Sequence, residues 1–282
     1  MTNTRETAAP LLRPDQIADL LILPTLAASV AAQAASVVHI GSSSLRIPRV
    51  KQDPSAAWVS EGEEIPASDA VLDEIEVTPK KLAGLTIISS ELAADSSPEA
   101  TRSIGAGLVR DLARKLDAAF LGTNAGNANQ ATGLQDVAGV TEIATTATGD
   151  YVAPELLVQA ISATEQQGTT ITAWIAHPND VAELSTIRTV IGTNFPPIVG
   201  IGDTAPGQRS IYGIRLLSSP HVTAGTIWGI PGDRVNLVVR KNAEVTTDKS
   251  AFFTSDRVAV RAIMRAEFAY PHPEAITKIT LP

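Results

Sequence analysis

The spacing of apolar residues is most regular between residues 98 and 121. There an apolar side chain recurs every four positions with charged residues in between, which predicts one long helix with a single apolar stripe: Ile104, Leu108, Leu112, Leu116 and Phe120. Pro98 suits the first turn, where its missing N–H leaves nothing unpaired, and Gly122 is typical of a C-terminal stop. At about 1.5 Å per residue the helix would be about 36 Å long. We therefore expect the rest of the chain to pack along it.

A period of two replaces this pattern upstream of the helix. Residues 45–50 and 71–77 alternate between apolar and polar side chains, and residues 82–88 run back towards the helix. We interpret 45–88 as one long two-stranded hairpin, whose first strand is confined to an edge by Pro48. Two strands alone are marginally stable in water. The hairpin is therefore expected to need another surface to lie on.

The remaining segments predict an α+β fold. Short or medium helices are expected at 24–35, from a cap at Asp150 to Gln167, and from Pro178 onwards, while 192–210 has the glycine and proline content of a loop. The order is helix and hairpin first, then a mixed α/β insert near 150–232, then antiparallel strands. The expected strands are 140–144, 172–177, 211–217, 226–230, 235–241, 257–269 and 275–281.

Charge changes this picture because it is concentrated. The formal net charge is −8, and residues 61–76 contain seven acids and no base, so charge is nearly balanced over the rest of the chain. An acidic balance argues against a protein whose free surface grips nucleic acid through phosphate contacts. The chain has no cysteine, which excludes disulfides and thiolate metal sites.

No catalytic, metal or cofactor site is predicted. The sequence lacks the G-x-S-x-G elbow of many hydrolases, and its four histidines never have the spacing of metal ligands. The acidic segment lacks EF-hand spacing and is placed at an exposed hairpin tip, where a charge run is usually a solvated face. The apolar run at 20–38 is diluted by alanine and polar residues, so we interpret it as a packed helix rather than a signal peptide or membrane span.

An acidic hairpin beside a helix with one basic side is better explained as an interaction surface. Identical copies would place the hairpin of one chain on the helix of the next, which is a heterologous contact. The residues predicted to make it are Trp58, Glu61, Glu63, Glu64 and Asp69 on the hairpin tip and Arg102, Arg110, Arg114 and Lys115 on the helix. An intracellular α+β hydrolase remains as an alternative of a different class.

Several short motifs also resemble one protein family, in the same order along the chain. AWVSEG and IPASD in 57–69 are similar to its hairpin, and ISSEL (88–92) with the Asp-Ser-Ser-Pro run at 95–98 is similar to the entry into its spine helix. The other motifs are QATGL (130–134), WIAHP (174–178), GIPGD (229–233), RAIMR (261–265) and PEA (273–275). The sequence thus resembles tailed-phage major capsid proteins of the Hong Kong 97 type over residues 40–282.

The resemblance implies an icosahedral shell around double-stranded DNA, built of hexamers and pentamers of this chain. It implies an N-terminal arm at 1–44, an extended hairpin loop at 45–88, and a peripheral domain with the spine helix at 89–149 and 233–282. The axial domain would be 150–232. The protein would then be a virion component without enzymatic activity, assembled in the bacterial host cytoplasm, with a portal and a separate scaffolding protein as partners. DNA would be enclosed without sequence-specific contacts, and no membrane would be involved.

Two features of the family are not expected here. Met1 begins directly with the arm, with no helical scaffold segment before it. Some relatives crosslink a hairpin lysine to a neighbour's asparagine, but the lysines here stand at the hairpin base (Lys51, Lys80 and Lys81), although Asn242 and Glu244 occupy a peripheral strand. An encapsulin, a bacterial shell of the same fold that encloses a cargo enzyme, is the closest alternative.

Overall fold

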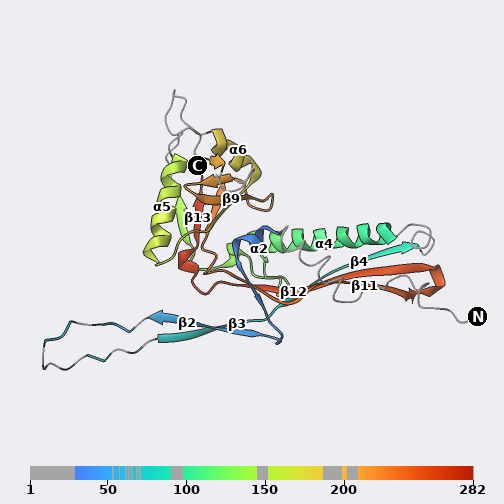
Figure 1. The fold of residues 1–282 in the computed structure, drawn as a ribbon, viewed down its shortest axis with the longest axis horizontal. Helices are drawn as coiled ribbons and strands as arrows, with labels where there is room; N and C mark the ends of the chain where they lie inside the picture. The colour runs from blue at the N-terminus through green and yellow to red at the C-terminus, as the bar shows by residue number, and fades with distance from the viewer. Residues whose placement is uncertain are drawn as a thin grey trace, which may run out of the picture.

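The computed structural model has two sheets, one long helix and a hairpin that extends away from both (Figure 1). The structure describes residues 29–52, 54–56, 58–60, 62, 64, 66–67, 69, 71–89, 98–144, 152–186, 199–201 and 209–281.

The long helix α4 covers Pro98–Leu121, with the bounds that the sequence predicts. Leu112, Leu116 and Phe120 of its apolar stripe are buried, and the ring of Phe120 lies 4.8 Å from that of Phe268, centroid to centroid. The stripe therefore faces the sheet that contains Phe268, as amphipathic periodicity requires.

That sheet has four strands in the order β1-β11-β12-β4. The strands are β1 (Ser36–His39), β11 (Asn236–Phe252), β12 (Arg257–Ala269) and β4 (Lys80–Ser89). β1 runs parallel to β11 and the other pairs are antiparallel. The sheet and α4 enclose the larger hydrophobic core, to which the short helix α2 (Val30–Ala34) contributes alanines.

The second sheet has seven strands in the order β5-β13-β10-β6-β9-β8-β7. They are β5 (Thr141–Ala144), β13 (Thr277–Thr280), β10 (Thr226–Ile230), β6 (Ala173–Ala176), β9 (Ile214–Ser218), β8 (Arg209–Ile211) and β7 (Val199–Ile201). The helices α5 (Val152–Gln166) and α6 (Pro178–Thr186) belong to the same end of the molecule (Figure 1). Leu157, Trp174 and Ile227 are among the buried residues of this second core.

Three short 3-10 turns complete the described elements: η1 (Leu134–Asp136), η2 (Phe253–Ser255) and η3 (Pro273–Ala275). Gly229, in the middle of β10, is needed for close packing, because a Cβ there would lie 2.8 Å from the Trp174 ring. This explains the first glycine of the GIPGD motif.

The hairpin consists of β2 (Leu45–Gln52) and β3 (Val71–Val77), paired antiparallel. It extends away from the two sheets (Figure 1). Its base packs on the body, where Ile47, Ile75 and Val77 meet Val238 and Ala269.

Two buried carboxylates connect elements of the body that are distant in the sequence. Asp117, near the end of α4, accepts hydrogen bonds from the Ser29 hydroxyl at 2.6 Å and from the N–H groups of Val30 and Ala31 at 3.1 and 3.0 Å. It thereby satisfies the free donors at the start of α2. Glu267 on β12 is ion-paired with Lys80 at 3.2 Å and accepts from the N–H of Thr132 at 2.8 Å.

The structure corrects the predicted strand partners. Residues 80–89 are not the returning arm of the hairpin, because β4 pairs with β12, and alternation alone does not identify a partner strand. Likewise, 211–217 is not one strand: a turn at Tyr212 and Gly213, both with positive φ, separates β8 from β9. The predicted loop 192–210 contains β7 and the start of β8, and β11 continues eleven residues beyond 241.

Two strands from the predicted peripheral segments belong to the second sheet. The sequence places 141–144 and 277–280 with the peripheral segments, whereas β5 and β13 pair with each other and, through β10, join the sheet of the predicted axial insert. Part of the predicted helix 24–35, its residues 24–28, and the predicted cap Asp150 lie outside the described residues.

Candidate intersubunit surfaces

The hairpin exposes apolar and acidic side chains together. Trp58 is fully exposed in the segment that joins β2 to β3, and Leu72 on β3 is 69% exposed. Glu64 and Asp69 are exposed too, while Glu61 and Glu63 lie outside the described residues. No described base pairs with Glu64 or Asp69. Of the predicted hairpin residues, those described are thus available for contact.

Two acids of the same segment are not available in this way. Arg46 pairs with Glu74 at 3.1 Å, and Arg49 pairs with Asp73 at 3.4 Å, across the β2–β3 ladder. Arg49 also donates to the backbone carbonyl of Pro271 at 3.3 Å, which ties the hairpin base to the body. The sequence pattern did not pair 45–50 with 71–77 specifically, although basic residues in the first segment and acidic residues in the second are the signal that could have indicated this pairing.

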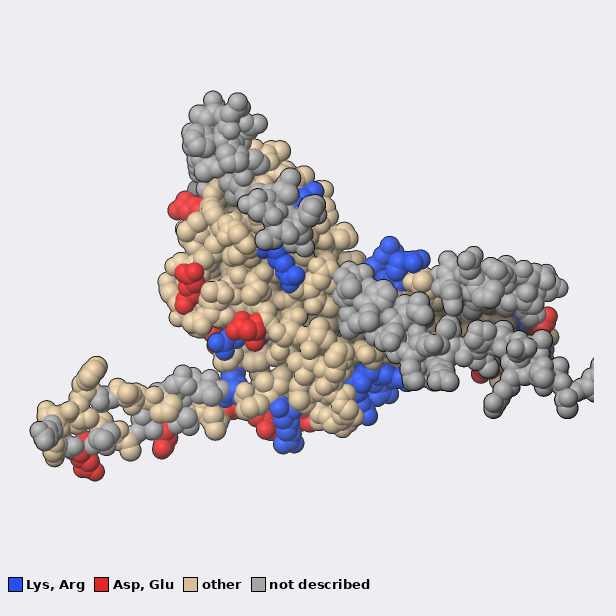
Figure 2. All heavy atoms as spheres, viewed as in Figure 1, with Lys and Arg blue, Asp and Glu red and all other residues tan. Residues whose placement is uncertain are grey.

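The basic side of α4 is exposed as predicted for three of its four residues. Arg110, Arg114 and Lys115 are exposed, and no described carboxylate pairs with them; the side chain of Arg102 lies outside the described residues. Figure 2 shows one group of basic side chains over α4, further basic groups elsewhere on the body, and isolated acidic side chains on the distant hairpin. The structure does not bring the two predicted halves of the contact together within one chain.

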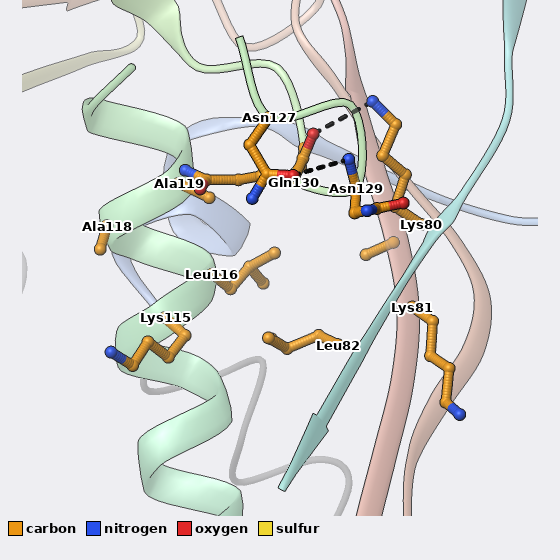
Figure 3. Close-up of a pocket in the computed structure, with 12 residues that line it drawn as sticks. Lys80, Lys81, Leu82, Lys115, Leu116, Ala118, Ala119, Asn127, Asn129 and Gln130 are labelled. Carbon is orange, nitrogen blue, oxygen red and sulfur yellow. Dashed lines mark hydrogen bonds between the residues drawn. The ribbon is translucent and has the colours of Figure 1, made fainter. Parts of the chain in front are cut away.

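A hollow of about 380 Å³ lies beside this basic side, and we call it the α4 hollow. Figure 3 shows it between α4, β4 and the loop after α4. Lys115 and Lys81 extend outwards on opposite sides of it (Figure 3). It is lined by Lys80, Lys81, Leu82, Lys115, Leu116, Ala118, Ala119, Asn127, Asn129, Gln130, Ala131 and Ala266.

The loop wall of the α4 hollow is held in place by a network. The ammonium of Lys80 donates to the backbone carbonyl of Gln130 at 3.0 Å. At the end of the loop, the Asp136 carboxylate accepts from the hydroxyl of Thr123 and from the N–H of Asn124 at 2.6 Å. These two hydrogen bonds, the hydroxyl's first, lower the pKa of Asp136. The hollow is therefore formed before anything enters it.

The opposite face of the four-stranded sheet offers a second surface that the sequence analysis missed. Leu85 and Ile87 of β4 are 60% and 41% exposed, and the exposed Arg261 faces Leu85 across the ladder. A groove of about 450 Å³ runs here, which we call the sheet groove. It is lined by Leu85, Thr246, Thr247, Asp248, Ala251, Phe252, Ala259 and Arg261. Assigning β4 to the hairpin had hidden this surface.

The described residues contain no group of three or more histidine, aspartate or glutamate side chains that could hold a metal ion. His177 accepts a hydrogen bond from the N–H of Asn179 at 3.2 Å, so its ring caps the start of α6. Among the described helices, none combines the length and the apolar character of a membrane span.

Comparison with known proteins identifies the family. The family model described as "Phage capsid family" matches residues 11–281. No curated protein matches. Among solved structures, this chain is similar to one from Mycobacterium phage Bobi, with a TM-score of 0.73 and 16% identity, covering 100% of this chain and 95% of that one.

Two further structures agree. The capsid of a native GTA particle has a TM-score of 0.71 and 18% identity, covering 100% of this chain and 95% of that one. A chain from Microbacterium phage Oxtober96 has a TM-score of 0.70 and 16% identity, covering 100% and 96%. The predicted Hong Kong 97-type capsid fold is thereby confirmed, and the encapsulin alternative is not favoured. The chain belongs to the phage capsid family.

Proposed function

We propose that this capsid protein assembles as hexamers and pentamers into the icosahedral head of a tailed phage, through heterologous contacts of its hairpin. Membership of the phage capsid family implies a structural component of the virion that associates with copies of itself. The observation that carries the proposal is the hairpin: it projects from the body with a fully exposed tryptophan and with acids that have no described base as partner. A chain that worked alone would gain nothing from this arrangement.

In this proposal the acidic hairpin of one subunit meets the basic side of α4 on the next. Glu64 and Asp69 would face Arg110, Arg114 and Lys115, with Glu61, Glu63 and Arg102 belonging to the same two groups. Each exposed ion pair gives only about 0–1 kcal/mol. Strength would therefore come from apolar burial and from repetition around the shell.

The domain roles follow the sequence prediction. Residues 1–44 would be the arm, 45–88 the hairpin loop, 89–149 and 233–282 the peripheral domain, and 150–232 the axial domain at the capsomer centre. The strands β5 and β13, from the two peripheral segments, extend the sheet of the axial segment. The shell would enclose double-stranded DNA without reading its sequence, and its acidity would reduce adhesion of the DNA. Assembly would take place in the bacterial cytoplasm with a portal and a separate scaffolding protein, and without catalysis by this chain.

The test is to purify the chain and examine it by light scattering and electron microscopy. We expect shells or capsomers, and in infected cells particles that carry a tail and contain DNA. Particles that contain a protein cargo instead would favour the encapsulin alternative. A stable monomer of about 30 kDa that does not associate at any concentration would contradict the proposal, and an enzymatic activity in that monomer would favour the hydrolase.

A further inference from the structure

Trp58 differs from the other two tryptophans of the chain. Trp174 and Trp228 are 0% and 1% exposed, whereas the whole side chain of Trp58 is in solvent. Tryptophan contributes a large apolar area and is enriched among the residues that dominate interface energies. In a chain of which only 4% is aromatic, an indole exposed to water in the segment that joins β2 to β3 indicates a binding partner.

The α4 hollow has the properties of a tryptophan acceptor. Its volume of about 380 Å³ falls in the range of about 300–1,000 Å³ typical of binding pockets. Leu82, Leu116 and Ala266 give it an apolar lining between the polar loop and the lysines. Its loop wall is held by the hydrogen bonds of Lys80 and Asp136, so binding would cost little ordering.

The charges at the two places are complementary. Lys81 and Lys115 flank the hollow and have no described carboxylate partner, while Glu64 and Asp69 follow Trp58 within the same segment and have no described base as partner. In the sheet groove, by contrast, the charges of Asp248 and Arg261 offset each other, so this groove has no comparable attraction for an acidic segment.

Trp58 does not reach the α4 hollow of its own chain, since the hairpin extends in the opposite direction from α4 (Figure 1). Building on the proposed function, we propose that Trp58 of one subunit inserts into the α4 hollow of a neighbouring subunit, between Lys81 and Lys115. Trp58 is then the anchor of the hairpin contact, and the ion pairs around it set its register.

The absence of native cysteines makes a direct test possible. Trp58→Cys is combined in turn with Lys81→Cys, Lys115→Cys and Asn129→Cys, three positions around the mouth, since the shorter cysteine would reach the mouth rather than the floor. A disulfide requires Cα atoms about 4.4–6.8 Å apart. After assembly and mild oxidation, we expect at least one pair to give a ladder of linked subunits on a denaturing gel.

The control pairs keep Trp58→Cys and place the second cysteine elsewhere. Val158→Cys, an exposed position on α5, is expected to give no ladder, and Leu85→Cys tests the sheet groove. Shells that form without a ladder from any of the three mouth pairs, or with a ladder only from Leu85→Cys, would overturn the inference while leaving the proposed function intact. If the cysteine-free parent forms no shells, it is the proposed function that fails.

Tryptophan fluorescence gives a second readout. Because Trp174 and Trp228 are already buried in the single chain, only Trp58 can move from water to an apolar site on assembly. We expect a blue shift of emission when the wild type assembles and none in Trp58→Phe, which retains an aromatic ring and should still form shells. For Trp58→Ala we expect the subunit concentration needed for assembly to rise at least about 30-fold. A wild type that assembles with unchanged emission contradicts the inference.

Discussion

The body and the hairpin of this protein differ in how their carboxylates and aromatic side chains are placed: those of the body's core are buried, with the carboxylates hydrogen-bonded, and those described on the hairpin tip are exposed to solvent. In the body, carboxylates that leave water find donors, as Asp117 and Glu267 do, and aromatic side chains such as Phe120 are fully buried. On the hairpin beyond its base, Trp58, Leu72 and the described acids of the tip face solvent. The core of the body is thus complete in a single chain, whereas the hairpin tip is proposed to bury its side chains only in an assembly. Mutations in the body should therefore lower the stability of the single chain, whereas mutations in the hairpin should impair shell assembly.

Shortening the hairpin should have the largest effect on shell assembly while leaving the stability of the single chain nearly unchanged. Gln52 and Val71 face each other at the end of the β2–β3 ladder, so a two-residue Asn-Gly turn can replace residues 53–70. We expect complete loss of shells in electron microscopy. Circular dichroism and thermal unfolding of the shortened chain should stay close to those of the unassembled wild type. A shortened chain that still closes into shells would show that the hairpin tip is dispensable.

Removing a buried carboxylate from the body should show the reverse. Asp117→Ala leaves the Ser29 hydroxyl and two N–H groups of α2 without their acceptor, and we expect a loss of about 2–4 kcal/mol in the free energy of unfolding. Urea unfolding of the unassembled chain measures it.

Asp111→Ala is the matched control, because Asp111 is an exposed carboxylate on the same helix. Its effect should stay within about 0.5 kcal/mol. Equal effects of the two substitutions would mean that the hydrogen bonds between α2 and Asp117 add nothing to the free energy of unfolding.

A smaller effect on the body is expected at alkaline pH. Tyr270 donates to the carbonyl of Thr132 at 3.0 Å, and burial, followed by the charge of Glu267, raises the pKa of its phenol well above the ordinary value of 10.0. The folded state therefore keeps this proton when the unfolded chain releases it. Stability is fully present below pH 10 and falls above it by up to about 1.4 kcal/mol per pH unit.

Tyr270→Phe tests this dependence. We expect it to lose about 1 kcal/mol at neutral pH, through the lost hydrogen bond, and to have a flatter stability profile than the wild type above pH 10. The measurement is urea unfolding at a series of pH values. Parallel profiles for the two proteins would assign the alkaline decline to other groups.

The acids of the hairpin should have the smallest effects. Glu64→Gln and Asp69→Asn are expected to weaken the shell by less than about 1 kcal/mol per contact, and the difference should shrink as salt screens the charges. Light scattering across a salt series measures this. Glu74→Gln is the control, since its partner Arg46 belongs to the same hairpin and the assembly should not sense it. Salt-independent effects would point away from ion pairing.

The periodicity of apolar residues predicted those elements whose structure follows from their local sequence alone. The bounds of α4 and of β12 agree with the expected 98–121 and 257–269, because a regular pattern extends between clear end signals. It did not predict β1, which follows directly on a short alanine-rich helix, or the polar second half of β11, which depends on its long pairing with β12. Partner choice was the main failure, as β4 shows.

The same limit applies to the candidate surfaces. The exposure of Trp58, Arg110 and Lys115 followed from local pattern and was predicted correctly. The α4 hollow could not be predicted, because three segments distant in the sequence form it and because Lys80 had been assigned to the hairpin base. Its loop wall is held by the hydrogen bond from Lys80 to Gln130, and Lys80 is also ion-paired with Glu267, which is 187 positions away in the numbering and shares no local pattern with it.

The hydrogen bonds of Asp117 have a practical consequence for engineering. They fasten the chain at Ser29 to a fixed point near the end of the long helix α4. A peptide or enzyme fused upstream would thus be tethered at one defined place in every copy. A repeating display with a spacing set by the lattice rather than by the linker would result.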